Sequence, residues 1–281
     1  MILRPLLLSL LFITSSHAVV EDWFMDKAIT YRQSVDGVQP DTAGGWNVEV
    51  GVTTTTPGEA TSASIVRVGS ATVHPLVYED GEWVFEGDYS SEAEMNLEFP
   101  SNSTYTITLS GGTLGTKIQT FTLGPADYPN VPYLTGHDFT RSQSIDAAAD
   151  FTLNWSDAGN FASATSLEIE DRLNDSITDE YEFDGLPLTS SQLIPEDTFS
   201  PGYSYEGYLS FLNTVETSGA AGFGTIGYIE HSSNLSFDLQ TVLSPNVDAI
   251  VGAWQFGDGA ADASGVLVFQ ADGTYFHAED T

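Results

Sequence analysis

The sequence contains no cysteine and very few basic residues, and each shortage excludes a class of function. Without Cys among its 281 residues, the chain cannot form disulfides, thiolate zinc sites or cysteine nucleophiles. It has 7 Lys and Arg against 40 Asp and Glu, a formal charge of −33. Such a charge repels nucleic acid and anionic lipid. We therefore expect no nucleic-acid partner. Acids spread along the whole chain are typical of a surface adapted to a salty medium.

Long apolar runs are also missing, except for one at the N-terminus. Arg4 precedes an apolar run over residues 6–13, and Ser16 and Ala18 then place small residues where a signal peptidase reads. The run is too short for a bilayer span of about 20 residues. We predict a signal peptide over 1–18 and an exported mature chain of charge −34 with no membrane span. Secreted, cell-surface and periplasmic locations all stay open, as does the oligomeric state.

From Ala28 onward, short β-like segments alternate with turn clusters. Two of them resemble each other, because each follows a Phe and a Pro-containing turn. In the first, residues 99–109, one face carries Tyr105, Ile107 and Leu109. In the second, residues 199–211, one face is predicted to carry four large residues: Tyr203, Tyr205, Leu209 and Phe211. Two such strands indicate two copies of one β unit.

Four local features complete the secondary-structure prediction. Residues 151–155 place Phe, Leu and Trp155 on one face of a strand. A strand is also predicted over 139–141, and a hairpin turn near 231–233. Residues 91–94 have the form of a capping box, which favours a short helical turn, although the apolar residues at 93, 95, 97 and 99 also alternate as in a strand.

These patterns predict an all-β chain with two tandem antiparallel β-sandwich domains and a short C-terminal β segment. After the signal peptide, the predicted parts are a first sandwich at 19–124, a Pro-rich linker at 125–132, a second sandwich at 133–241, a linker at 242–249 and an incomplete β segment at 250–281. Two or three strands cannot close a core alone. We therefore expect the last segment to begin a further domain.

The second unit resembles a fibronectin type III or immunoglobulin-like sandwich. The resemblance lies in Trp155 on an early strand and in Pro201-Gly202 followed by Tyr203 and Tyr205; the first unit looks like a divergent relative. The tail, with Gly252-Ala-Trp254 and Asp272-Gly-Thr-Tyr275, is similar to the start of lipocalin-like small-barrel repeats of secreted bacterial proteins. Neither resemblance implies a catalytic residue.

Candidate sites are few. Trp83, with acids on both sides of it in the sequence, and Tyr208, which points opposite Tyr205, are candidate ligand-binding rings, because exposed aromatic rings can stack on sugars. The loop 257–265 offers Asp258 and Asp262 as oxygen ligands, so Ca²⁺ is the one cofactor to consider. Its spacing departs from the EF-hand pattern, however, and a plain Asp-Gly turn stays an alternative. No nucleophile-elbow or phosphate-binding motif is present.

The sequence therefore favours an exported, non-enzymatic surface or secreted interaction protein. Its modules would bind protein or glycan in adhesion, or act as spacers. The alternative is a secreted carbohydrate-active enzyme or its carbohydrate-binding accessory module. That alternative rests on the acids around Trp83 and requires two carboxylates about 5–10 Å apart in an aromatic groove.

Overall fold

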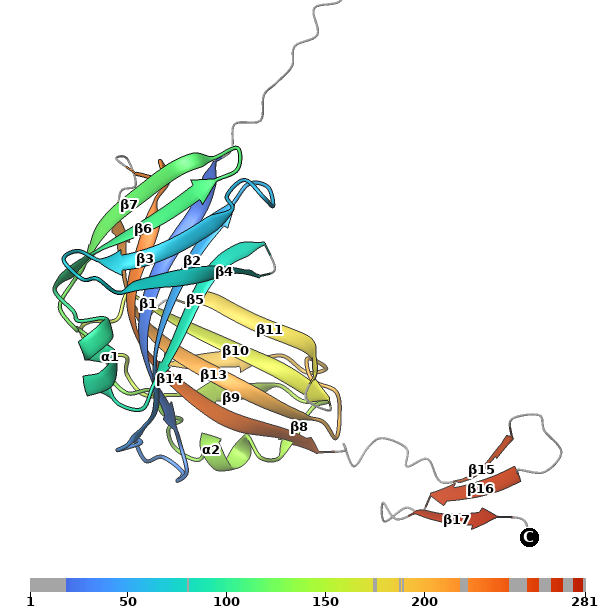
Figure 1. The fold of residues 1–281 in the computed structure, drawn as a ribbon. Helices are drawn as coiled ribbons and strands as arrows, with labels where there is room; N and C mark the ends of the chain where they lie inside the picture. The colour runs from blue at the N-terminus through green and yellow to red at the C-terminus, as the bar shows by residue number, and fades with distance from the viewer. Residues whose placement is uncertain are drawn as a thin grey trace, which may run out of the picture. The chain divides into compact units, whose positions relative to one another are not determined.

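A computed structural model describes residues 19–79, 81–173, 176–186, 188, 190–217, 222–242, 252–257, 264–269 and 275–279. The predicted all-β class is confirmed, because strands dominate and only two short helices interrupt them in the described part of the chain (Figure 1). Two compact units divide the chain. Unit 1 comprises the described residues of Met1–Ile29, Gly44–Pro129 and Leu212–Ser232; unit 2 comprises Thr30–Ala43, Asn130–Phe211 and the described residues of Ser233–Thr281.

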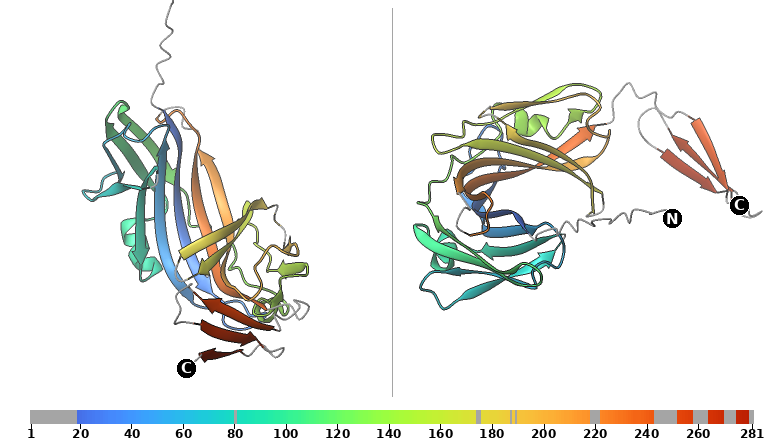
Figure 2. Two further views of the ribbon diagram at one scale, coloured as in Figure 1. Left: turned by 90° about the vertical axis from the view of Figure 1, so that its right-hand side faces the viewer. Right: turned by 90° about the horizontal axis from the view of Figure 1, so that it is seen from above.

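Unit 1 is built on one curved sheet (Figure 2). Its strand order is β14-β1-β2-β5-β4-β3-β6-β7. The bounds are β1 Val20–Arg32, β2 Ala43–Thr54, β3 Ser62–Arg67, β4 Val73–Glu79, β5 Glu82–Tyr89, β6 Ser103–Gly111, β7 Gly115–Leu123 and β14 Gly227–Val242. Trp23 of β1 and Phe121 of β7 lie far apart in this order, yet their ring centroids are 5.0 Å apart. The sheet therefore folds over on itself and encloses the core of the unit.

Two sequence predictions in unit 1 are confirmed. Tyr105, Ile107 and Leu109 of β6 are all fully buried, as their alternation indicated. Helix α1, Glu92–Glu98, begins at the predicted capping box. The backbone N–H of Glu94 donates to the Ser91 hydroxyl at 3.2 Å, and a Glu94 carboxylate oxygen accepts from the Ser90 backbone N–H at 2.9 Å. The first bond satisfies an N–H group that the first turn of a helix leaves free, and the second ties the residue before the N-cap to the helix.

Unit 2 packs two sheets around a second core. One sheet has the order β11-β10-β13-β14 and the other pairs β9 with β12; the bounds are β9 Phe151–Asn154, β10 Ala164–Leu173, β11 Ser176–Leu186, β12 Ser191–Ile194 and β13 Ser204–Thr217. A two-residue strand, β8 Ile145–Asp146, pairs in parallel with β14. Phe151, Leu153 and Trp155 all enter this core, which confirms the predicted strand face. In the 199–211 segment Tyr205, Leu209 and Phe211 are buried too.

The structure corrects three local predictions. Tyr203 precedes β13 and is 39% exposed, so it does not share the buried face. Residues 139–141 form the end of helix α2, Asp138–Arg141, and not a strand. Asp138 favours the helix because its buried carboxylate accepts from the Arg141 guanidinium at 2.6 Å and from the Asn154 backbone N–H at 2.7 Å.

The third correction concerns the predicted hairpin at 231–233. Strand β14 continues through these residues without a turn. His231, Ser232 and Ser233 are all buried, and the Ser232 hydroxyl has a carboxylate partner on β1. Polar residues that usually mark a turn are here accommodated inside a long strand.

The C-terminal segment forms its own antiparallel sheet, in the order β15-β16-β17. The strands are β15 Gly252–Gly257, β16 Ser264–Phe269 and β17 Tyr275–Glu279. This agrees with the two or three strands predicted there. Among the residues that the structure describes, no helix has the length and apolar character needed to cross a membrane.

Candidate binding face

The outward side of four neighbouring strands in unit 1 carries one charged side chain, Glu79 at the end of β4. In the order β4-β3-β6-β7, cross-strand partners on this side include Val73, Val66, Thr106 and Thr120, followed by a second row that contains Ser64 and Thr108. We call this surface the hydroxyl face. It consists of Ser62, Ser64, Val66, Val68, Val73, Pro75, Val77, Thr104, Thr106, Thr108, Ser110, Thr116, Ile118, Thr120 and Thr122.

Strict alternation produces this face. Side chains of a strand point alternately to opposite sides, and the intervening residues Ile65, Ile107 and Phe121 fill the core of unit 1. Apart from Glu79 at the end of β4, the outward positions are Thr, Ser, Val and Ile, with one Pro. Most of these residues are β-branched and suit a pleated surface. Hydroxyl pairs cross the β6–β7 ladder at 3.2 Å, from Thr104 to Thr122 and from Thr106 to Thr120. They hold the side chains of this half of the face in fixed positions.

Apolar groups on the face are open to water. Val68, Val73, Val77 and Ile118 have exposed fractions of 50–60%. Apolar side chains that lie together on a surface mark contact sites more often than scattered ones do. The face therefore combines exposed methyl groups with hydroxyl groups that can donate or accept hydrogen bonds.

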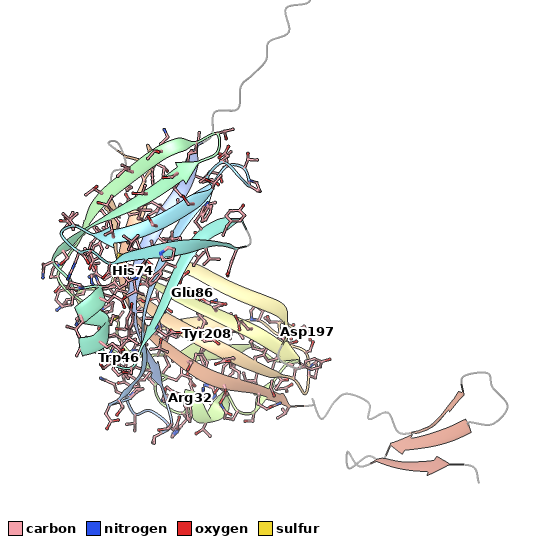
Figure 3. The ribbon with its side chains drawn as sticks, in the orientation of Figure 1. Arg32, Trp46, His74, Glu86, Asp197 and Tyr208 are labelled. Carbon is pink, nitrogen blue, oxygen red and sulfur yellow. The ribbon has the colours of Figure 1, made fainter. Side chains whose placement is uncertain are left out.

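The outward side of the same sheet becomes acidic at the boundary between β4 and β5. Figure 3 labels His74 of β4 and Glu86 of β5, one residue from each side of this boundary. Beyond this boundary, Glu86 of β5 is the ladder partner of Glu49 on β2. Burial raises the pKa of the Glu49 carboxyl, and Glu86 and Glu82 raise it further. In this sheet the acids thus lie mainly on β1, β2 and β5, and Glu79 of β4 borders the hydroxyl face as the ladder partner of Glu82.

Asp26 of β1 belongs to this acidic side. Its pKa is raised to about 7, first by burial and then by the negative charge of Glu230. Burial also raises the pKa of Glu82 on β5. Perturbed acids can mark functional sites. However, no group of three or more His, Asp or Glu side chains in the described residues is arranged to hold a metal ion.

A cavity of about 60 Å³ lies where β3 turns into β4. Its strand residues Arg67, His74 and Tyr105 alternate with those of the hydroxyl face, so the cavity lies on the core side of the sheet. Its walls come from β3, β4, β6 and the end of α1. Its lining residues are Arg67, Ser70, Thr72, His74, Leu97, Glu98, Phe99 and Tyr105. We call it the Arg67 pocket. Within it, Nδ1 of His74 lies 3.5 Å from a carboxylate oxygen of Glu98.

A second cavity, of about 210 Å³, lies in unit 2 beside Arg141 and Phe151. The Arg141 guanidinium lies 5.0 Å from the centroid of the Phe151 ring, and it also pairs with Asp138. The Arg141 guanidinium thus already has partners within unit 2. Unlike Arg67, it is not available to bind a ligand in this cavity.

The aromatic candidates from the sequence are on separate units. Trp83 of β5 is half-buried, packs against the core of unit 1 and lies 5.2 Å from the Tyr78 ring. Its partner in the ladder is Val52, which is fully buried. Tyr208 of β13 is also half-buried, in unit 2, on the strand side opposite Tyr205. Whether either ring binds a ligand stays a prediction.

The candidate calcium ligands, Asp258 and Asp262, lie outside the described residues, so that site also stays a prediction. The sequence did contain a signal for the hydroxyl face that was missed. Thr104, Thr106 and Thr108 alternate with buried residues, and Thr120 and Thr122 repeat the pattern on the next strand.

Comparisons with known proteins add little. No family model matches the sequence, and no curated protein matches it. Among solved structures, the chain is similar to the crystal structure of chicken CNTN1 FN1–FN3 domains at 10% sequence identity and a TM-score of 0.27. The match covers 77% of this chain and 68% of that chain. At this TM-score, the similarity supports no argument about function.

Proposed function

We propose that the chain is an exported, non-enzymatic interaction protein that binds a protein partner through the hydroxyl face of unit 1. The observation that supports this proposal is a contrast: fifteen outward residues carry no charge and only Glu79 at their edge does, in a chain with 40 acids against 7 bases. Charged side chains are depleted at the centres of protein interfaces. A charge must lose its hydration on binding, whereas methyl and hydroxyl groups lose much less.

The size of the face supports a weak, reversible contact. Four strands spaced about 4.8 Å apart, with a rise of about 3.3 Å per residue, give an area of roughly 400–500 Å². A standard stable interface buries about 800 Å² on each partner. The hydroxyl face alone is therefore suited to a transient contact, as in surface recognition.

The partner is expected to be neutral or basic overall. The acidic strands β1, β2 and β5 continue the same sheet beside the hydroxyl face. They attract basic surfaces and repel acidic ones over about a Debye length. A second copy of this chain, with its charge of −33, is for that reason a poor partner.

A peptide-display selection on residues 19–242 tests the proposal. We expect peptides that bind the wild type and lose binding to Ile118→Glu, which places a charge on the hydroxyl face. The matched control is Leu193→Glu. Leu193 lies in unit 2 and is 48% exposed, close to the 50% of Ile118, so the same change there should leave binding intact.

Equal binding by both variants, or no selected peptide at all, would contradict the proposal. A glycan array run in parallel, with and without Ca²⁺, tests the carbohydrate alternative. If a glycan binds the wild type but not Trp83→Ala, the functional site is the Trp83 region and not the hydroxyl face.

A further inference from the structure

Arg67 is an unpaired cation in an acid-rich protein. It ends β3 with its side chain on the core side of the sheet, opposite the hydroxyl face, and lines the Arg67 pocket. Among the described residues, its guanidinium has no hydrogen-bond or ion-pair partner. By contrast, Arg32 pairs with Asp238 at 2.8 Å and Arg141 with Asp138 at 2.6 Å. A guanidinium presents a planar fork of donors that matches a carboxylate.

The walls of the pocket complement such a ligand. Ser70 and Thr72 bring hydroxyl groups to the rim, and the Ser70 hydroxyl accepts from the Thr72 backbone N–H at 3.1 Å, which fixes the turn. Phe99 and Tyr105 are fully buried behind them. A polar rim over an apolar floor strengthens a charge-assisted hydrogen bond, because less water competes for it.

The volume restricts the ligand. At roughly 10–15 Å³ for each water-sized group, the 60 Å³ cavity holds about four to six non-hydrogen atoms. A carboxyl group with one or two methylenes fits this space, whereas a sugar acid with its ring does not. The hydroxyl face also contains no aromatic ring on which a sugar could stack.

Glu98 is the one acid in the pocket wall. A Glu98 carboxylate oxygen lies 3.5 Å from Nδ1 of His74 and makes no ion pair with Arg67. A bound carboxylate would still be repelled by Glu98. Neutralising Glu98 should therefore raise the affinity of the pocket for an anionic ligand and lower its affinity for a cationic one.

We propose that the Arg67 pocket binds a carboxylate of a peptide, either an acidic side chain or a C-terminus. The proposal rests on the proposed function, since the carboxylate belongs to the partner that lies on the hydroxyl face and reaches past the β3–β4 turn, at Ser70 and Thr72, into the pocket. Arg67 holds the carboxylate through its paired N–H donors, and the hydroxyls of Ser70 and Thr72 provide further donors.

The test uses the side-chain Nε–H signals of arginine in residues 19–281, which contain only four arginines: Arg32, Arg67, Arg141 and Arg172. Three acetylated tetrapeptides of Thr and Val serve as probes. One has a free C-terminal carboxylate, one has an internal Asp and an amidated end, and one is amidated and neutral. Glucuronate is the fourth probe. We expect a saturable shift of the Arg67 signal with either or both acidic peptides and none with the neutral peptide.

Variants supply the second readout. Arg67→Gln should lower the affinity for the acidic peptide about tenfold or more, which is the loss expected when a hydrogen bond to a charged group is removed. Glu98→Gln should raise the affinity for the same peptide several-fold. No Arg67 shift with either acidic peptide, an equal shift with the neutral peptide, or a response to glucuronate alone would overturn the proposal.

The two proposals fail separately. If displayed peptides require Ile118 but ignore Arg67→Gln, the hydroxyl face binds a partner and the carboxylate pocket is wrong. If the Arg67 signal responds to acidic tetrapeptides while the display selection yields nothing, the pocket is right and the proposed function of the face is wrong.

Discussion

The hydroxyl of Ser232 on β14 lies within hydrogen-bond distance of both carboxylate oxygens of Asp26 on β1, at 3.1 and 2.9 Å. This contact explains why a polar residue is buried in the middle of a long strand. It also lowers the pKa of Asp26, but burial and the nearby Glu230 raise it more, to about 7. Between about pH 4 and pH 7 the folded protein therefore holds a proton that the unfolded chain, with an ordinary Asp pKa of 3.8, has lost.

Asp26→Asn is expected to stabilise the protein increasingly as pH rises. Because the folded pKa lies above the unfolded one, the contribution of Asp26 to stability falls between about pH 4 and pH 7. The shift corresponds to at most about 4 kcal/mol. Asp26 keeps part of its surface in water, so we expect about 1–3 kcal/mol at pH 8 and little difference at pH 4.

Urea unfolding of wild type and variant at pH 4, 6 and 8 measures this difference. The control is Asp88→Asn, which neutralises an exposed acid of β5 and should show no comparable trend. A difference between wild type and Asp26→Asn that stays constant across these pH values would contradict the assigned pKa.

Lys27→Met is expected to destabilise unit 1, with a loss that grows above pH 8. Lys27 is fully buried, and its ammonium group donates to the Phe99 carbonyl at the end of α1 at 2.8 Å and to the Asn96 side chain. Removing the donor leaves both acceptors unsatisfied and costs about 1–3 kcal/mol.

The pH trend separates this from a simple packing defect. Burial lowers the pKa of Lys27 from 10.5 to about 8. Between these values the unfolded chain binds the extra proton, so wild-type stability gains from this group as pH rises. Met has no such gain. Thermal unfolding at pH 7 and pH 9.5 should show a larger deficit at the higher pH, and an equal deficit would mean that Lys27 is not desolvated.

How much of this could be predicted depends on whether a pattern is local. Alternation along the chain predicted the buried faces of β6 and β9, and the capping box predicted α1. Helix α2 was predicted as a strand, because its stability comes from bonds between Asp138 and Asn154, sixteen residues away. No local pattern contains that information.

The start of β1 and the hydroxyl face were missed for related reasons. Acids and Lys27 interrupt the apolar pattern of β1, and Lys27 points to the core only because α1 supplies its partners. The threonines of β6 and β7 could be read as strand residues, but β3 and β4 join them only through the sheet order. Sequence periodicity predicts which side of a strand a residue occupies, but it does not predict which strands are neighbours in the sheet.

Gly227→Ala is expected to destabilise unit 1 strongly. The Trp23 indole lies directly over Gly227, so an added Cβ would approach ring carbons that are fully buried and have no room to move. Overpacking of this kind costs about 1–3 kcal/mol or more. Gly124→Ala is the control, since a Cβ at Gly124 meets nothing within 4 Å. If both variants unfold at the same urea concentration, the Trp23–Gly227 contact is wrong. Because leucine is smaller than the indole, Trp23→Leu combined with Gly227→Ala should cost less than the sum of the two single changes.

Trp155→Ala is expected to cost about 3–5 kcal/mol, the usual penalty for deleting a large aromatic side chain from a packed core. Trp155 is 2% exposed in the core of unit 2, and its backbone pairs with that of Leu134, which is also fully buried. The control is Phe161→Ala in the same unit, because Phe161 is 53% exposed and its loss should cost well under 1 kcal/mol. Chemical denaturation followed by tryptophan fluorescence and circular dichroism compares the two variants. Equal, small losses would mean that Trp155 does not fill the core, because a cavity there cannot be free of cost when the surrounding side chains are held by two sheets.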